Sequence, residues 1–230
     1  MADKYKNYAE LRAAEQIGKD YNIECDLFSD EMILVVPHGG GIEVGTTELS
    51  QEVELRIKEG LISAYYFNTT KPSNNVDLHI TSANFDEPVG VGAVTNNKHA
   101  ISFHGYADSK EENTIVGGLD EEFKQIVIRH LKSQGFNAEA ATTRFTGTDP
   151  KNIVNRCEHG AGVQLELSTL QRKKFFANDD WSAGNRHNRT EILERYASAI
   201  ALAIDEYTEG RVTFDEDNLV ISMQSHSDDL

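Results

Sequence analysis

The sequence contains few of the residues that build disulfide frameworks, flexible linkers or membrane spans. Only two of its 230 residues are cysteines, Cys25 and Cys157, and neither lies in a Cys-x-x-Cys pair. A disulfide framework, a zinc knuckle and a dithiol redox site are therefore excluded, and each cysteine is expected to be a small buried side chain. The four prolines form no linker-like stretch. No apolar run approaches the roughly 18 residues that span a bilayer, so we expect no membrane partner.

Positive charge is also scarce. The 22 Lys and Arg residues are outnumbered by 38 Asp and Glu residues, which gives a formal net charge of −16 at pH 7. A chain this acidic is repelled by phosphate backbones unless it carries a concentrated basic patch, so nucleic acid is not an expected partner. Residues 1–19 are charged and helix-patterned, without the apolar segment of a signal peptide. We therefore expect synthesis in the cytoplasm.

Apolar runs of strand length alternate along the chain with apolar residues at helical spacing. Strands that alternate with helices favour an α/β fold, in which helices cover both faces of an open, mostly parallel or mixed sheet. We predict one domain over residues 1–208 and an acidic extension or terminal strand over residues 209–230. The predicted strands span residues 20–27, 32–36, 61–67, 76–80, 100–103, 114–116 and 162–168, and the predicted helices span residues 8–17, 46–60, 123–131 and 192–204.

The segment Pro37-His38-Gly39-Gly40-Gly41-Ile42-Glu43 follows a buried strand, at the sheet edge where ligands of α/β proteins bind. His38 and Glu43 can reach one ion only if the loop folds back, which the glycines allow because they adopt positive φ without steric cost. An esterase oxyanion loop would need a Gly-x-Ser-x-Gly elbow, which residues 180–184 do not supply. A dinucleotide fingerprint would need glycine in place of Val44. A turn with an incidental histidine remains an alternative.

A second histidine, His104, directly follows another apolar strand, and Gly105 leaves space beside it. His38, Glu43 and His104 on loops of one sheet edge would form the His₂Glu set that binds catalytic zinc and leaves a fourth position for water. His79 lies within the segment 78–82. For His79, a role beside the metal ligands or against the substrate is weighed equally with a packed position in the core.

Glu166 lies within an alternating segment, residues 162–168, that places it on the polar face of a strand. A carboxylate in the middle of a strand is disfavoured unless it faces water or a partner. Either this strand lies at an exposed edge, or Glu166 faces a cleft. In a cleft, Glu166 could serve as the general base that a zinc hydrolase needs.

Arginine side chains are candidates for holding an anionic substrate, because a guanidinium group binds a carboxylate bidentately. The alternative for each is a surface position that balances acidic neighbours. The pair Asn155-Arg156, close before the strand of Glu166, is the favoured anchor. The full set of candidates is Arg144, Asn155, Arg156, Arg172, Arg186 and Arg189.

Six motifs together resemble the zinc-dependent poly-γ-glutamate hydrolases of Bacillus phages and prophages, a family whose fold is similar to that of carboxypeptidase A. The resemblance runs from the N-terminal helix to Ile204. The motifs are PHGGGIE (37–43), LHITS (78–82), FDEP (85–88), SFHGY (102–106), NIVNR (152–156) and GVQLELS (162–168).

The resemblance implies that residues 1–208 are a zinc hydrolase domain with one Zn²⁺ per chain, held by His38, Glu43 and His104. It further implies that Glu166 is the catalytic glutamate and that Asn155 and Arg156 hold a substrate carboxylate. Four residues separate His38 from Glu43, whereas carboxypeptidases have two residues between the corresponding ligands. The peptide specificity of carboxypeptidases is therefore not transferred to this chain.

The expected function is endo-hydrolysis of the γ-glutamyl amide bonds of poly-γ-glutamate by a monomer that host lysis releases. At physiological salt, exposed charges are screened beyond about 8 Å, so a local arginine-lined groove can bind a polyanion despite the acidic surface. One alternative is a related zinc amidohydrolase that acts on peptidoglycan or a small-molecule deacylase. Another is a prophage interaction protein that a metal stabilises and that catalyses nothing.

Overall fold

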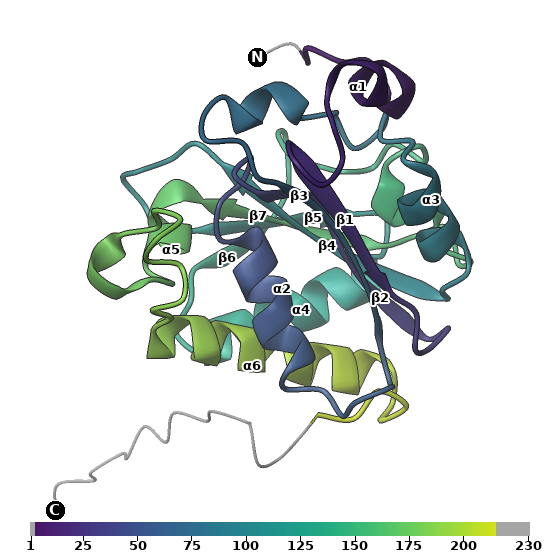
Figure 1. Cartoon of the computed structure of the whole chain (residues 1–230). Helices are drawn as coiled ribbons and strands as arrows, with labels where there is room; N and C mark the ends of the chain where they lie inside the picture. The colour runs from purple at the N-terminus through teal and green to yellow at the C-terminus, as the bar shows by residue number, and fades with distance from the viewer. Residues whose placement is uncertain (1–2, 215–230) are drawn as a thin grey trace, which may run out of the picture.

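A mixed sheet runs through the centre of the molecule (Figure 1), and its strand order is β1-β3-β2-β4-β7-β5-β6. The computed structural model describes residues 3–214. Strands β3, β2, β4 and β7 are mutually parallel, while β1 pairs antiparallel with β3 and β5 antiparallel with β7. The strands are β1 (Tyr21–Asp26), β2 (Met32–Gly40), β3 (Ser63–Thr69), β4 (His99–Tyr106), β5 (Thr114–Gly118), β6 (Ala138–Ala140) and β7 (Val163–Ser168).

Helices cover both faces of this sheet. Helices α2, α4 and α6 pack on one face, while α1, α3 and the short 3₁₀ helix η2 pack on the other (Figure 1). No helix among residues 3–214 has the length and hydropathy needed to cross a membrane. The helices are α1 (Tyr8–Ala14), α2 (Thr46–Glu54), α3 (Pro88–Thr95), α4 (Glu121–Ser133), α5 (Thr169–Lys173) and α6 (Glu191–Tyr207), with 3₁₀ helices η1 (Asn75–Leu78), η2 (Ile153–Arg156) and η3 (Ala177–Asp179).

Strand β2 is apolar throughout because both of its faces are buried. Met32, Leu34 and Val36 point into the core beneath α2 and α6, whereas Ile33 and Val35 point into the core beneath α1 and α3. Such a continuous apolar run is typical of a parallel strand between two layers of helices. The expected α/β fold, with a mixed sheet and helices on both faces, is confirmed.

One predicted strand is wrong. Residues 76–80 do not pair with the sheet, and η1 covers the first part of this segment. The side chain of Asn75 accepts a hydrogen bond from the backbone N–H of Lys71 and donates one to its carbonyl oxygen, which closes a turn here. Leu78 and Ile80 are both buried. Their alternation therefore reflects burial at the edge of the core, without a neighbouring strand.

Three strands or α-helices were not expected from the sequence. Helix α3 begins at Pro88, and the preceding Glu87 caps it by accepting hydrogen bonds from the backbone N–H groups of Val89 and Gly90. Proline in the first turn after a capping carboxylate is a helix-start signal, so α3 was detectable in principle. Strand β6 and helix α5 have 3 and 5 residues, too few for a periodic pattern.

The ends of the predicted domain are only partly described. Helix α6 ends at Tyr207, and Val212 beyond it is buried in the core. Residues 215–230, which make up most of the predicted acidic extension, lie outside the described residues, so the boundary at residue 208 remains a prediction. Both cysteines are free; Cys157 is buried and Cys25 is partly buried.

A β-bulge in β2 sets the direction of His38. Val36 pairs with Tyr66 and Gly39 with Asn68, so two residues of β2 lie opposite the single residue Phe67 of β3. Because the bulge inserts one residue, His38 takes the place that simple alternation gives to residue 37. His38 thus shares the sheet face of Val35, where its ring lies 6.4 Å from that of Phe85.

Gly40, the second glycine after the bulge, leaves no room for a side chain. Gly40 has φ +67°, and a Cβ at this position would overlap the backbone of Thr69 on β3. We expect Gly40→Ala to lower the free energy of unfolding by roughly 2–5 kcal/mol, the left-handed penalty plus the cost of overpacking. Gly18→Ala is the matched control, since Gly18 has φ +81° but no atom within 4 Å of the added Cβ. It should cost only roughly 1–2 kcal/mol in urea unfolding; equal losses in the two variants would contradict the close approach.

Candidate active site

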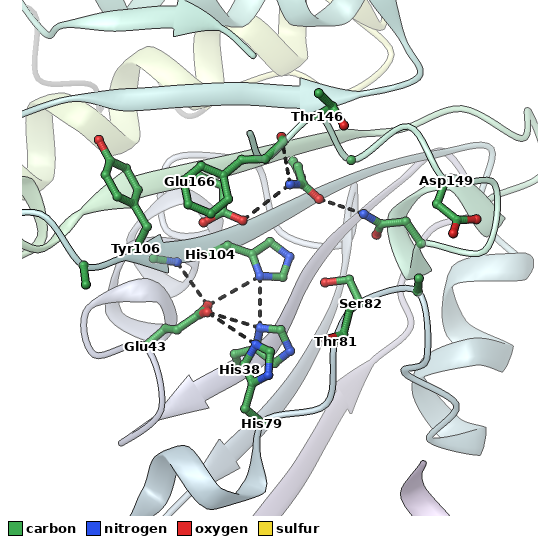
Figure 2. A pocket seen from close by; sticks show the side chains of 17 residues that line it. His38, Glu43, His79, Thr81, Ser82, His104, Tyr106, Thr146, Asp149 and Glu166 are labelled. Atoms are coloured by element: carbon green, nitrogen blue, oxygen red, sulfur yellow. Dashed lines mark hydrogen bonds and ion pairs between the residues drawn. The ribbon is translucent and has the colours of Figure 1, made fainter. Parts of the chain in front are cut away.

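The candidate site lies at the carboxyl ends of three neighbouring strands. His38 lies near the end of β2 and His104 near the end of β4, so both are strand residues and not loop residues as the sequence analysis expected. That expectation was wrong because each strand goes on pairing with its neighbour beyond the histidine. Glu166 lies on β7, directly opposite His104 in the strand register. Glu43 follows β2 in a tight turn. The backbone N–H of Glu43 donates to the carbonyl oxygen of His38 over 3.0 Å. The parallel arrangement of β2, β4 and β7 thus brings four residues from three separate parts of the sequence to one edge of the sheet (Figure 2).

Three potential metal-ligand atoms converge at this edge. The Nδ1 atoms of His38 and His104 are 3.1 Å apart, and each lies 3.4 Å from one carboxylate oxygen of Glu43. Ligand atoms of these three residues all lie within 4.8 Å of one another. The structure therefore brings together the three residues that the sequence analysis selected as metal ligands (Figure 2).

A hydrogen bond at its outer nitrogen turns a lone pair of His38 toward the centre of this cluster. Nε2 of His38 lies 2.8 Å from the carbonyl oxygen of Ile80, which can only accept, so Nε2 carries the proton. In the neutral ring, Nδ1 of His38 is then an acceptor that faces Nδ1 of His104 and the Glu43 carboxylate. Acceptors that face one another are repulsive unless a proton or cation lies between them. Two imidazoles and one carboxylate are the donor set of many catalytic zinc sites, so the residues fit a divalent cation.

Electrostatic effects shift the pKa values of the two carboxyl groups of the site in opposite directions. Burial alone raises the pKa of Glu43, but the neighbouring His38 and His104 lower it well below its ordinary range. The backbone N–H of Gly105 also donates to Glu43 over 3.0 Å. In contrast, burial and the charge of Glu43 raise the pKa of Glu166 well above its usual value. Glu43 is thus held as an anion, whereas Glu166 is able to take up and release a proton.

Glu166 faces a cavity and not an exposed sheet edge, because β7 lies between β4 and β5. The side-chain amide of Gln164 donates to Oε1 of Glu166 over 3.4 Å, and Asn152 in turn donates to Gln164 over 2.7 Å. Both Gln164 and Asn152 are buried and line the cavity, and neither was selected from the sequence. The position of Gln164 two residues before Glu166, on the same strand face, was a signal for it.

His79 forms one wall of the cavity. Its ring centroid is 4.0 Å from that of His38, and its Nδ1 lies 2.7 Å from a carboxylate oxygen of Asp3. Burial and the charge of His38 lower the pKa of His79, against the opposing effect of Asp3 and Glu43. His79 is therefore part of the site and not of the core. Asp3 was missed because 76 residues separate it from His79.

The cavity itself has a volume of about 560 Å³, within the size range of small-ligand pockets. The three potential metal ligands and Glu166 line it. Two loops form walls of the cavity, residues 81–83 and residues 145–147 with Asp149, and Tyr106 also lines it (Figure 2). None of the six candidate substrate anchors is among its lining residues.

Asn155 organises the loop that forms one of these walls. Its amide nitrogen donates to the carbonyl oxygens of Gly147 and Asp149, and its amide oxygen accepts from the backbone N–H groups of Leu119 and Gly162. All of its hydrogen-bonding capacity is thus directed at the backbone. Direct contact of Asn155 with substrate stays a prediction that these hydrogen bonds do not support.

Four of the candidate arginines also have partners elsewhere. Arg156 donates to the carbonyl oxygens of Lys151 and Ala83. Arg186 donates to those of Trp181 and Gly40, and Arg189 binds the side chains of Glu52 and Gln51. The buried Arg172 donates to the carbonyl oxygens of Val44, Leu167 and Tyr106. These contacts give each guanidinium group a structural role.

Arg144 differs from the other arginines. Its side chain is exposed, and its guanidinium carbon lies 4.9 Å and 5.2 Å from the ring centroids of Tyr106 and Phe145. Both rings line the cavity. Within residues 3–214, Arg144 makes no ion pair. Arg144 is therefore a cation at the rim of the cavity that is available to an anionic ligand.

The fold and the site together define an α/β protein with a His₂Glu cluster and an adjacent protonatable glutamate, the residue set of metal-dependent hydrolases. Residues 5–199 match the model of the poly-γ-glutamate hydrolase family. The chain belongs to this family, and the resemblance stated from the sequence is confirmed.

Relatives and solved structures agree with this assignment. The chain is 37% identical over 207 residues to the SPbeta prophage-derived protein YoqZ of Bacillus subtilis (strain 168), which covers 89% of this chain and 73% of YoqZ. A structure of a bacteriophage poly-γ-glutamate hydrolase is 48% identical, with a TM-score of 0.87 and coverage of 90% of this chain and 99% of that one. The zinc-free apo form of YndL is 31% identical, with a TM-score of 0.80 and the same coverage.

The contacts of Arg172 predict a structural effect on mutation. Arg172→Leu would leave three backbone carbonyl oxygens without their donor, so we expect the free energy of unfolding to fall by about 3 kcal/mol or more. Arg189→Leu serves as the control, since a partly exposed ion pair contributes at most about 1 kcal/mol. Urea unfolding measures both. An Arg172→Leu variant of wild-type stability that binds substrate poorly would instead support a direct substrate contact.

Proposed function

We propose that the chain is a zinc-dependent hydrolase that cuts internal γ-glutamyl amide bonds of poly-γ-glutamate. The observation that carries the proposal is the convergence of His38, Glu43 and His104 at one point, with Glu166 beside them. The family match supports the substrate, and the relative that was solved in a zinc-free apo form supports the metal. Action of a monomer outside the cell after host lysis remains a prediction.

The residues of the site divide the chemistry between them. His38, Glu43 and His104 would hold the zinc ion, which supplies a Lewis acid that makes water more nucleophilic at neutral pH. Glu166 accepts the proton of the attacking water and passes it to the nitrogen of the departing α-amine. The raised pKa of Glu166 suits this role because the side chain must hold the proton between the two transfers. Gln164 holds one carboxylate oxygen of Glu166 in place.

The negative charge of the substrate is bound by a local cation beside the cavity and not by the protein surface as a whole. Every repeat of poly-γ-glutamate carries a free α-carboxylate, and Arg144 at the rim of the cavity is positioned to bind one. The net charge of −16 opposes the approach of a polyanion at long range, but salt screens this repulsion. A single exposed arginine beside the cavity can therefore determine affinity.

The role of Glu166 is tested by Glu166→Gln, which preserves the size of the side chain but cannot accept the proton. We expect the rate of viscosity loss of a poly-γ-glutamate solution to fall by about 10²–10⁴-fold, while the zinc content stays near one ion per chain. His104→Ala should instead lose the zinc. An active Glu166→Gln variant would exclude it as the base.

Parallel assays on poly-α-glutamate and on muropeptides test the substrate. Preference for muropeptides would replace the proposed function with that of a peptidoglycan amidase. A protein whose melting temperature falls on chelation but which hydrolyses none of these substrates would be the non-catalytic alternative.

The role of Arg144 is tested by Arg144→Ala. We expect KM for the polymer to rise about tenfold, since a charge-assisted contact to a carboxylate is lost, with little change in kcat. Arg129→Ala is the matched control, because it removes the same charge from an exposed arginine that pairs with Glu206 on α6. Steady-state kinetics at two salt concentrations measure KM for both variants. An equal change of KM in the two variants would contradict the assignment.

A further inference from the structure

Asp3, close to the N-terminus, contacts two residues that line the cavity of the candidate active site. One of its carboxylate oxygens lies 2.7 Å from Nδ1 of His79, and the other accepts the backbone N–H of Thr81 over 2.7 Å. His79 and Thr81 both line the cavity. The carboxylate of Asp3 thus joins the N-terminal segment to the wall of the cavity next to the metal cluster.

The segment that carries Asp3 is fixed in place by several further contacts. Lys4 forms an ion pair with Asp77 over 3.4 Å. The backbone N–H of Tyr8 donates to Asp86 over 2.6 Å, and the side chain of Tyr8 is buried. These contacts hold residues 3–8 against the loop that contains His79, so the pairing of Asp3 with His79 is part of a packed interface.

The pairing determines which nitrogen of His79 carries a proton. An ionised carboxylate only accepts hydrogen bonds, so Nδ1 of His79 must donate to Asp3. In the neutral imidazole, Nε2 is then left as an acceptor. Nε2 lies 3.9 Å from Glu43, beyond hydrogen-bonding distance, and His79 lines the cavity. Asp3 therefore presents a lone pair of His79 to whatever occupies the cavity.

The chemistry of the polymer indicates what this lone pair can bind. With its α-carboxylate ionised, an internal repeat of a γ-linked glutamate chain has a single hydrogen-bond donor, the amide N–H. Its carbonyl oxygen and its carboxylate only accept hydrogen bonds. The unprotonated Nε2 of His79 is also an acceptor, so it cannot pair with either of them.

We propose that Asp3 is a positioning residue for His79, whose Nε2 accepts a hydrogen bond from a backbone amide N–H of bound poly-γ-glutamate. This inference rests on the proposed function for the identity of the substrate. Arg144 would then bind the carboxylates of the polymer, and His79 would bind its amide groups. A polymer chain would be oriented by contacts of both kinds before its bond is cut.

The first test needs no substrate. Long-range ¹H–¹⁵N NMR spectra of the zinc-loaded protein report which ring nitrogen of each histidine is protonated. We expect His79 in the Nδ1–H form, and we expect this preference to be lost in Asp3→Ala. Lys6→Ala, an exposed side chain on the same segment, should leave it unchanged. An Nε2–H form in the wild type would overturn the inference whether or not the protein hydrolyses poly-γ-glutamate.

The second test is kinetic. Asp3→Ala should raise KM for poly-γ-glutamate about three- to tenfold, the effect of one hydrogen bond, with kcat and zinc content nearly unchanged. His79→Gln places an amide oxygen near the position of Nε2 and should retain more affinity than His79→Ala. Because glutamine has no equivalent of Nδ1, adding Asp3→Ala to His79→Gln should have no further effect.

Three outcomes separate the explanations. Additive effects of Asp3→Ala and His79→Gln would show that Asp3 does not act through His79. A loss of zinc or of kcat in Asp3→Ala would show that the pair supports the metal cluster and not the substrate. If the wild type leaves poly-γ-glutamate intact, the proposed function fails, while the NMR result still decides the pairing of Asp3 with His79.

Discussion

The constraint on which the site depends is the convergence of two imidazole nitrogens and one carboxylate. Such a cluster is repulsive unless a proton or cation lies between its atoms, so the rest of the structure must hold it together. Ile80 holds the outer nitrogen of His38, and the backbone of Gly105 holds Glu43. These two hydrogen bonds direct the remaining polar atoms inward. The cation-binding capacity of the site therefore comes from its neighbours as much as from its ligands.

The sheet supplies this arrangement through irregularities at its carboxyl edge. The bulge in β2 turns His38 toward His104, and Gly40 lets the chain pass close to Thr69. Arg172 packs against Gly105 and ties the turn after β2 to β4 and β7 through three carbonyl oxygens. A buried guanidinium group thus holds the loops of the site in register.

Sequence reasoning predicted the parts of this structure that depend on local pattern. The strand ends that carry His38 and His104 followed from apolar runs that stop at a histidine, and Glu166 from its place in an alternating segment. Other features depend on contacts between distant residues. No local pattern distinguishes the buried Arg172 from an exposed arginine, or joins Asp3 to His79 across 76 residues. The sequence predicts a strand over residues 76–80 because buried alternation looks the same with or without a neighbouring strand.

The central claim is that His38, Glu43 and His104 bind one divalent cation. Anomalous diffraction at the zinc absorption edge, from crystals of the protein grown with zinc, tests this claim most directly. The account predicts a single peak enclosed by Nδ1 of His38, Nδ1 of His104 and the carboxylate of Glu43. A zinc-loaded crystal with no peak at that point, or with the ion bound by other residues, would contradict it.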